Sequence, residues 1–434
     1  MKLRALKIIS LFLACGMLFP VASCGEEKLP AELNGYEKEV GEVMFREKED
    51  KVENNTVVYN VDISIYNYAP SVLEEDENTR HVYYCSNKYT AGKLLGDSYQ
   101  DIDGNPQITD YIAYRKGIKY KSDWYWSEKK YVLKFTKDSP TEGTQTCDPN
   151  VIKGEFTYDG ETYPYLMAYL ACATRNNTYN HVCLAVAKSP EGPWKKCVNS
   201  NPFREYSSEG VPAEMQGQYL WGYGQASMIS VDKKGRILMF YTAIKPFYNA
   251  ESKSWGQGNA TTFERWNLSD LNNPVMEYQV EQMSFNGVER FGKAAGAVTN
   301  GDYAYDPQTD RIYMITDGQF NESKKETSGA PVAFIGNKSK DSIKEVGDVF
   351  SEFDKSTWQW NMVGYATPTD SENYNQVHNT AIIRDEYGWL TDSDQLEVAI
   401  TGSLHETTYK TKYPEAKHAE WSYRILRKTL EIKR

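Results

Sequence analysis

The sequence predicts an all-β fold: a five-bladed β-propeller with blades of about 77 residues, each a four-stranded antiparallel sheet. Two observations predict it. The 33 Tyr, 10 Trp and 15 Phe fall, with β-branched residues, in short runs between clusters of Gly, Asn, Asp and Pro, which is typical of many short strands. A similar segment also recurs along the chain at a nearly constant interval, which is typical of repeat folds.

The repeated segment sets the expected number of blades. Each copy begins with small residues, continues through a polar turn and ends in a strand rich in Tyr, Leu, Met, Ile and Val. Successive copies start 79, 77, 77 and 76 residues apart. Four-stranded units repeated radially form a propeller, whereas a β-sandwich with coincidental spacing is the alternative. The copies begin at Ala69, Asp148, Gln225, Asp302 and His378.

In a propeller the innermost strand of each blade lines the central channel, so the residues that begin these strands meet at one mouth of the channel. Four polar side chains are therefore expected to be neighbours in space: Asp148, Gln225, Asp302 and His378. The last copy, residues 378–434, has only 57 residues. We expect the strand candidate Thr56–Tyr66 to pack near it and help close the ring, because closure removes open sheet edges.

The N-terminus has the pattern of an export signal. Lys2, Arg4 and Lys7 precede an apolar run, and small residues stand directly before Cys24 in the stretch "VASC". This stretch resembles the lipobox of bacterial lipoproteins. The resemblance implies that Cys24 is lipidated and that the protein is exported as an outer-membrane or cell-surface lipoprotein. An ordinary cleaved signal with a chance cysteine is the alternative.

These features divide the chain into three parts. Residues 1–24 are the expected signal peptide, the charge-rich residues 25–55 an expected tether, and residues 56–434 the expected propeller. No later stretch reaches the ~18 consecutive apolar residues of a membrane helix, so membrane contact is expected through the lipid anchor only. A net charge of −11 argues against nucleic acid as a partner.

Cysteine usage leaves the pairing open. Beyond Cys24 the chain has Cys85, Cys147, Cys172, Cys183 and Cys197, an odd number for an exported protein. Cys172 and Cys183 flank a turn-like stretch and could form a disulfide across a hairpin, with buried free thiols as the alternative. The chain contains no CxxC or HExxH pattern, so a structural zinc site has no support.

Three motifs resemble glycoside hydrolase family 43 and its five-bladed relatives: "DPNV" at 148–151, "LAVAKSPEGPW" at 184–194 and "HN" at 378–379. The resemblance implies a general-base Asp in the first blade, an Asp that tunes the acid's pKa in the second, and a general-acid Glu in the third. Asp148 matches the second of these. His378 resembles a fifth-blade histidine near an axial metal, which implies a calcium site in the central channel, where calcium would take mostly oxygen ligands.

The other two positions depart from the family pattern. Ala69 stands where the base is expected, and Gln225 stands where the acid is expected, and neither side chain can exchange a proton. Glu214, in a Gly-rich loop, is our choice for a displaced acid, and Asp302 is a further catalytic candidate. The alternatives are a solvated loop carboxylate for Glu214, a turn-forming Asp-Pro for Asp148 and a structural histidine for His378.

Aromatic side chains near blade entrances are candidates for sugar stacking. Trp221 and Tyr223, directly before the third inner strand, are the preferred pair, and Gln225 and His378 complete the expected sugar contacts; Trp124, Trp126 and Trp255 are further candidates. The expected function is a surface-anchored glycoside hydrolase acting on arabinose-, xylose- or related sugar-containing oligo- or polysaccharide. The alternative is a catalytically inactive propeller that binds glycan.

Overall fold

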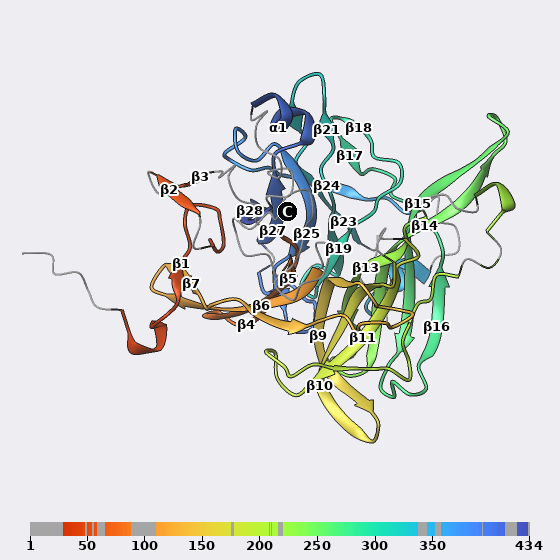
Figure 1. Cartoon of the computed structure of the whole chain (residues 1–434), viewed down its shortest axis with the longest axis horizontal. Coiled ribbons are helices and arrows are strands. Elements are labelled where there is room, and N and C mark those ends of the chain that lie inside the picture. The colour runs from red at the N-terminus through yellow and green to blue at the C-terminus, as the bar shows by residue number, and fades with distance from the viewer. Residues whose placement is uncertain are drawn as a thin grey trace, which may run out of the picture. The chain divides into compact units, whose positions relative to one another are not determined.

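The computed structural model describes residues 29–47, 50–53, 56–58, 66–87, 110–174, 178–207, 209, 211–215, 220–336, 345–351, 357–392, 394–412 and 423–432. The signal peptide, Cys24 and the middle of Thr56–Tyr66 lie outside these residues. The chain divides into two compact units, Met1–Asn34 and Gly35–Arg434. In the first, the described residues form a short 3₁₀ helix, η1 (Ala31–Leu33). The second unit contains the sheets (Figure 1).

Four sheets of the second unit are meanders in which strands that follow one another in the chain lie next to one another in space. The first sheet joins β4 (Asn67–Asp76), β5 (Thr79–Asn87), β6 (Asp110–Tyr120) and β7 (Asp123–Trp126), and adds β1 (Glu37–Lys38), β8 (Lys130–Leu133) and β26 (Arg384–Asp385). The second is β9 (Gln145–Tyr158), β10 (Glu161–Cys172), β11 (His181–Ala187) and β12 (Lys195–Lys196).

The third sheet is β13 (Gly222–Ser230), β14 (Arg236–Asn249), β15 (Ser254–Asn267) and β16 (Val275–Val280). The fourth is β19 (Asp302–Asp306), β20 (Arg311–Ile315), β23 (Ala330–Gly336) and β24 (Asn361–Ala366). The last repeat copy gives a three-stranded sheet of β25 (Gln376–Ile382), β27 (Gln395–Ser403) and β28 (Arg424–Glu431).

Short elements connect these sheets. The two-stranded pairs are β2 (Lys51–Glu53) with β3 (Thr56–Val58), β17 (Glu289–Arg290) with β18 (Lys293–Ala294), and β21 (Phe320–Asn321) with β22 (Glu326–Thr327). The remaining described helices are the 3₁₀ turns η2 (Ala213–Met215) and η4 (Asp348–Ser351) and the single α-helix α1 (Glu406–Lys412). No helix in the described ranges is long and apolar enough to cross a membrane.

The innermost strands form a ring: β4 contacts β9, β9 contacts β13, β13 contacts β19, β19 contacts β25, and β25 contacts β4. The all-β propeller arrangement predicted from the repeat is thus present. The expected count of five four-stranded blades is wrong, because only four sheets among the described residues have four or more strands. The fifth repeat copy is the shortest and forms a sheet of three strands, while its β26 pairs with β4 of the first sheet.

The N-terminal part of the second unit closes the ring along β28. Backbone hydrogen bonds join Met44 N to Ile425 O at 3.0 Å and Arg427 N to Glu42 O at 2.7 Å. Lys428 and Arg427 of β28 also pair with Glu42 and Glu39, at 2.9 Å each. Residues 39–44 therefore belong to the folded body, which differs from the expected tether of residues 25–55.

The expected closing segment Thr56–Tyr66 takes part at its end, where Tyr66 forms a parallel bridge with Tyr423.

Aromatic side chains fill the space between sheets. Trp124 and Trp126, expected as sugar platforms, are 3% and 0% exposed and pack with Phe45 and Tyr84 in the first sheet's core. A Cβ added at Gly117 would lie 2.5 Å from the Trp126 ring, so the absence of a side chain at residue 117 makes room for the indole. The prediction for these two tryptophans is wrong because blade packing needs large apolar side chains.

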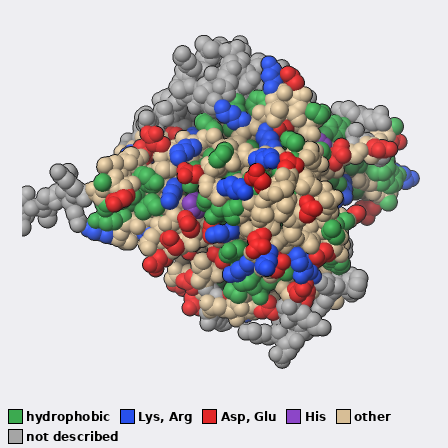
Figure 2. Space-filling model, turned by 90° about the horizontal axis from the view of Figure 1, so that it is seen from below, with side chains coloured by type: hydrophobic (Ala, Val, Ile, Leu, Met, Phe, Trp, Pro, Cys, Tyr) green, Lys and Arg blue, Asp and Glu red, His purple; other side chains and the backbone are tan. Residues whose placement is uncertain are grey.

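The surface carries charges of both signs. On the face shown in Figure 2, Lys and Arg side chains are interspersed with Asp and Glu side chains. Apolar side chains on the same face occur in small separate groups (Figure 2). Neither sign of charge dominates this face, although the whole chain has a net charge of −11.

Candidate functional site

The strands that begin the repeat copies share an unusual backbone conformation. Ala69, Asp148, Gln225 and Asn379 have positive φ angles of 51°, 44°, 54° and 34°. Each lies where the pairing register of its strand shifts, which is the mark of a β-bulge. Bulges bend a strand and re-aim a side chain, and they are frequent beside active sites. The repeat therefore turns these side chains toward a common point.

The bulges correct the alignment of the last two copies. In the fourth, Asn300 has a φ of 53° and precedes Asp302 by two residues, so Asn300 is the counterpart of Asp148. In the fifth, the counterpart is Asn379 and not His378. The spacing argument was wrong by one or two residues because it could not locate the extra residue of each bulge.

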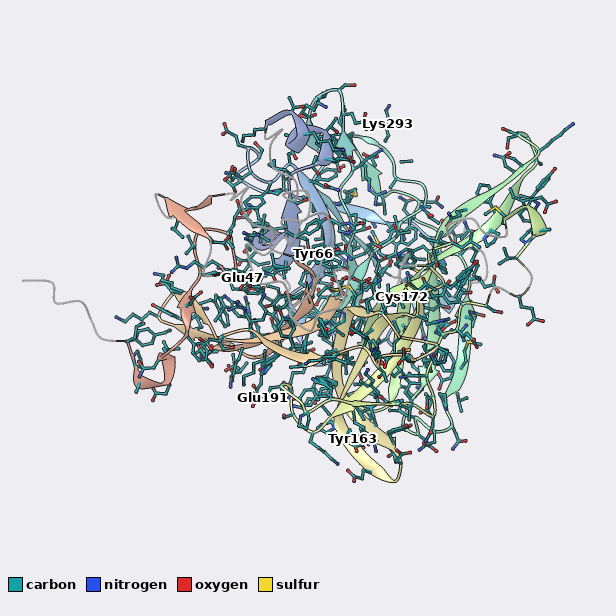
Figure 3. The ribbon with its side chains drawn as sticks, in the orientation of Figure 1. Glu47, Tyr66, Tyr163, Cys172, Glu191 and Lys293 are labelled. Carbon is teal, nitrogen blue, oxygen red and sulfur yellow. A yellow bond between two sulfur atoms is a disulfide. The ribbon has the colours of Figure 1, made fainter. Side chains whose placement is uncertain are left out.

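A cavity of about 260 Å³ opens at this point. Usual ligand pockets measure about 300–1,000 Å³, so this one suits a single sugar residue better than a chain passing through it. It is lined by Tyr66, Tyr68, Gln145, Cys147, Asp148, Leu170, Trp221, Gln225, Thr242, Ile244, Thr299, Asn300, His378 and Asn379. Figure 3 labels Tyr66, which forms part of the wall.

Most of the predicted site residues thus meet. Asp148, Gln225, His378 and Trp221 all line the cavity, as the convergence of the inner strands predicts. Tyr223 is not among the lining residues. Its ring packs instead between the sheets, against Tyr206 and Tyr241, with centroids 5.2 and 5.4 Å away.

Asp148 is the only carboxylate among the residues that line this cavity. The side chain is buried, and burial raises its pKa to about 7, although the nearby His378 lowers it and Asp110 and Asp317 raise it further. A carboxyl with a pKa near neutrality holds its proton much of the time at pH 7. Asp148 can therefore donate a proton, which an ordinary aspartate cannot do.

His378 faces a second carboxylate. Its Nδ1 lies 3.5 Å from Asp317 Oδ2. Burial opposes the charged imidazolium, but the Asp317 carboxylate outweighs this, with help from Asp148, so the pKa of His378 is raised. Asp317 is in turn hydrogen-bonded by the Asn300 amide at 2.5 Å. The charged form of this imidazole is therefore favoured relative to that of a free histidine, near the Asp148 carboxyl.

A disulfide borders Asp148. Cys85 of β5 is bonded to Cys147 of β9, the residue directly before Asp148. Of the two alternatives left open for Cys172 and Cys183, the disulfide does not form, because β10 and β11 pair in a register that sets Cys183 opposite Tyr169. Cys172, Cys183 and Cys197 are free and buried, in agreement with the alternative of buried thiols.

Asp302 lines the smaller of the two cavities among the inner strands, and its carboxylate links neighbouring sheets. Its carboxylate accepts hydrogen bonds from Ser227 Oγ at 2.5 Å, Asn150 Nδ2 at 3.3 Å and Ile382 N at 2.8 Å. Arg384 lies 3.3 Å away. These contacts tie the second, third and fifth sheets to the fourth, so the lone pairs of Asp302 are occupied. A catalytic role for Asp302 is therefore not what the geometry favours.

Glu214 is not brought to the site. It lies in η2 with an exposed side chain and is not among the described residues that line the cavity. Trp255 packs with the cluster of Tyr206, Met215 and Leu220, beside η2. It belongs to the hairpin of β14 and β15, which projects beyond the rest of its sheet (Figure 1). Neither residue contributes to the cavity wall.

A second, smaller cavity of about 30 Å³ lies deeper, between the inner strands, and it provides a test of the calcium expectation. Three buried atoms from residues of its lining have no hydrogen-bond partner: Gln225 Oε1, Asn379 Oδ1 and Thr380 Oγ1. Such orphaned oxygens are the kind of donor that a hard cation prefers. These oxygen donors fit calcium, whereas His378, whose Nδ1 faces Asp317, does not.

Sequence reasoning missed four residues of the site: Tyr68, Asp110, Asn300 and Asp317. Tyr68 stands next to a bulge and Asn300 has the same positive φ, so both could be found by aligning the copies on their small residues. Asp110 begins β6 and Asp317 follows β20, and they reach the mouth only through the fold. No signal in the sequence marks those two.

Comparisons with known proteins give fold similarity only. No protein-family model matches the chain, and no curated protein matches it. Among solved structures, the chain is similar to the family 117 glycoside hydrolase Zg3597 of the marine bacterium Zobellia galactanivorans, at 11% identity and a TM-score of 0.48, over 92% of this chain and 91% of that one.

A structure described as a glycoside hydrolase has 13% identity and a TM-score of 0.48, over 93% and 96% of the two chains. An α-L-arabinofuranosidase of Podospora anserina has 9% identity and a TM-score of 0.46, over 92% and 97%. At such low identities and TM-scores, we infer neither family nor substrate from them.

Proposed function

We propose that the protein is a glycoside hydrolase that cleaves a terminal sugar residue held in the 260 Å³ cavity. One observation carries the proposal: a buried carboxyl, Asp148, with a pKa of about 7, lines the same cavity as His378, whose pKa is raised, at the convergence of the inner strands. Groups whose surroundings shift their pKa values toward neutrality mark acid–base sites. A purely structural aspartate has no need of this arrangement.

In this proposal Asp148 is the general acid. It gives its proton to the glycosidic oxygen as the bond to the anomeric carbon breaks, and a water oxygen bonds to that carbon. His378, held by Asp317, stabilises the Asp148 carboxylate left after the transfer. Proton donation by a positioned side chain accelerates such reactions by about 10²–10⁴-fold.

The remaining lining residues suit sugar recognition. Gln225, Asn300 and Asn379 present amide groups that can pair with hydroxyls, and the Trp221 ring offers an apolar face. A wall with the aromatic rings of Tyr66, Tyr68 and Trp221 and several neutral amides fits an uncharged sugar. We infer an arabinose-, xylose- or related residue at the end of an oligo- or polysaccharide.

A glycan-binding protein without catalysis is the second candidate. Its specific support is that four of the five aligned positions have no ionisable group, since Asp148 is accompanied by Ala69, Gln225, Asn300 and Asn379. Hydrolysis with inversion normally uses two carboxyls about 6.5–9.5 Å apart. Release of sugar, rather than binding, therefore decides between the two functions.

We also propose export with a lipid anchor on Cys24, on the strength of the N-terminal pattern alone. Replacing the cysteine, as Cys24→Ser, in cells fed a radiolabelled fatty acid tests it. Label in the wild-type protein and none in the variant is expected. Label in both would contradict lipidation at this residue.

Calcium in the 30 Å³ cavity would be held by the side-chain oxygens of Gln225, Asn379 and Thr380. Gln225→Ala and Asn379→Ala remove two of the acceptors. We expect added calcium to raise the melting temperature of the chelator-treated wild type and to have little effect on the double variant. An equal rise in both proteins would exclude this site.

The function itself is tested on the mature chain, which lacks the expected signal peptide of residues 1–24. The mature chain is incubated with oligosaccharides of arabinan, xylan, arabinogalactan and pectin, and released sugar and binding are followed separately. Release of a monosaccharide is expected. Binding of the same oligosaccharides without release would favour the second candidate, and neither binding nor release would contradict both.

A further inference from the structure

The first sheet lacks an ionisable group at its bulge, where Ala69 stands, yet the residue before it has one. Tyr68 lines the cavity, and its hydroxyl donates a hydrogen bond to Asp110 Oδ2 at 3.0 Å. Asp110 is the first residue of β6, opposite Asn87 at the end of β5, so it lies at the mouth end of the sheet. The Tyr68 phenol and the Asp110 carboxylate bonded to it thus supply ionisable groups next to Ala69, which has none.

Asp110 is buried and incompletely paired. Its side chain is 6% exposed, and its Oδ1 is buried with no hydrogen-bond partner among the described residues. Burial raises the pKa of Asp110 to about 7, and the Tyr68 hydroxyl partly opposes this. A half-satisfied buried carboxyl costs stability, so its presence beside a cavity indicates a chemical use.

The Tyr68 ring is held in one orientation. It lies nearly parallel to the His378 ring, at 15° with centroids 6.4 Å apart, and meets the Tyr66 ring edge-on at 4.5 Å. Its oxygen is 2.6 Å from Cys147 Sγ, directly before Asp148. The phenol oxygen therefore lies between the Asp110 carboxylate and the wall that carries the proposed acid.

We propose that Tyr68, backed by Asp110, is the proton acceptor that activates the hydrolytic water. As the water oxygen bonds to the anomeric carbon, one water proton passes to Tyr68 Oη, and the phenol proton passes to Asp110. The glycosidic bond breaks, and Asp148 supplies the proton of the leaving oxygen, so one proton is gained on Asp110 and one lost from Asp148. This inference rests on the proposed function.

The place of Tyr68 in the cavity wall, and not only its hydrogen bond to Asp110, supports its role as proton acceptor. Tyr305 donates a similar bond to Asp310 at 2.9 Å, in the turn that joins β19 to β20. Tyr305 and Asp310 are not among the residues lining either cavity described above, so the bond itself is an ordinary structural device. Tyr305→Phe is accordingly the matched control, since it removes a phenol from a Tyr–Asp pair outside the site.

The roles of the two residues differ. Tyr68 would touch the reacting water and is the catalytic residue, whereas Asp110 acts through it and is a positioning residue. The proposed reaction requires that Asp110 is ionised and Asp148 is protonated in the same molecule. An ionised Asp110 favours the protonated form of Asp148, so the charge of one carboxyl supports the state required of the other.

The test compares wild type, Tyr68→Phe, Asp110→Asn and Tyr305→Phe, all as the mature chain, on a nitrophenyl glycoside of the released sugar. We expect kcat to fall at least 100-fold in the first two variants, with KM within about threefold, and to stay unchanged in Tyr305→Phe. The loss of rate toward low pH should also disappear in Asp110→Asn. Melting temperatures identify a variant that has lost its fold.

Azide gives a readout that a structural role would not move, because it attacks the anomeric carbon without losing a proton. We expect azide to restore turnover of Tyr68→Phe and Asp110→Asn and to yield the glycosyl azide. Two results would overturn this inference alone. One is an active wild type together with a Tyr68→Phe variant whose kcat is within threefold of it. The other is a slow variant that is folded but is not rescued by azide. Wild type without hydrolysis of any glycan would instead contradict the proposed function on which it rests.

Discussion

Cys147 is bonded to Cys85, and the next residue in the chain is Asp148. The only carboxylate among the described residues that line the larger cavity is therefore anchored to the neighbouring sheet by a covalent bond. The amide of Asp148 lies 2.8 Å from Cys85 Sγ. The disulfide thus joins the first and second sheets at the level of the proposed acid.

Loss of this disulfide should destabilise the fold. The bond closes a loop with a sequence separation of 62, for which chain entropy predicts a stabilisation of about 4 kcal/mol. We expect Cys85→Ser with Cys147→Ser to lower the melting temperature by several degrees, as measured by calorimetry. Alkylation of the unreduced, denatured mature chain should label Cys172, Cys183 and Cys197 and spare the other pair. Labelling of Cys85 would contradict the assignment.

The two raised carboxyl pKa values make stability depend on pH. Asp148 and Asp110 each titrate near 7 in the fold against an ordinary value of 3.8, so the folded state holds their protons more tightly than the unfolded chain does. Their contribution is fully present below about pH 4 and is lost as pH rises through about 7, by up to about 4 kcal/mol for each group.

We therefore expect Asp148→Asn and Asp110→Asn to be more stable than wild type at pH 8 and to differ less from it at pH 4. Denaturant unfolding at the two pH values measures this. A variant whose advantage over wild type is the same at both would show that the pKa of that carboxyl is not raised.

Residues 39–44 should contribute to the stability of the fold, although the sequence predicts a tether there. Deletion of residues 25–44 removes the hydrogen bonds of Met44 and Glu42 to β28 and the ion pairs of Glu39 and Glu42. We expect this deletion to unfold or strongly destabilise the protein, because it exposes the edge of β28. Deletion of residues 25–34 is the matched control and should change the melting temperature little. Equal stability of both deletions would contradict the role given to residues 39–44.

Gly117 should not tolerate a side chain. A methyl group there would meet the buried Trp126 ring at 2.5 Å, and overpacking of a core typically costs about 1–3 kcal/mol. Gly364 provides the control, since a Cβ added there meets Leu430 at an ordinary 3.6 Å. We expect Gly117→Ala to lower the free energy of unfolding and Gly364→Ala to leave it within about 0.5 kcal/mol. A neutral Gly117→Ala would mean that the first sheet can move away from Trp126.

The repeat predicted the propeller arrangement and the convergence of Asp148, Gln225 and His378, because the interval between copies carries information about radial neighbours. The repeat interval does not place the residues with positive φ, which are visible only in backbone angles, so it predicts Asp302 at the mouth where Asn300 stands. It also could not show that β28 obtains its neighbour from residues 42–44, since pairing between the chain's two ends leaves no local pattern.

The chemistry of the site was predicted less well than its location. Asp110 and Asp317 lie in parts of their sheets that the repeat does not align, and burial, which sets the pKa of Asp148 and Asp110, is a property of the packed structure. Glu214 was chosen for its loop composition, but composition does not fix where a loop packs. Large aromatic residues were ambiguous, because Trp124 and Trp126 serve the core and Trp221 the cavity.

The most direct test of the account is the release of monosaccharide from the oligosaccharide panel by the wild-type mature chain and by Asp148→Asn, with binding followed in parallel. The account predicts release by the wild type, a fall in kcat/KM of at least 100-fold in Asp148→Asn, and retained oligosaccharide binding by the variant. Undiminished release by Asp148→Asn, or binding without release by the wild type, would contradict the proposal that this carboxyl is the catalytic acid.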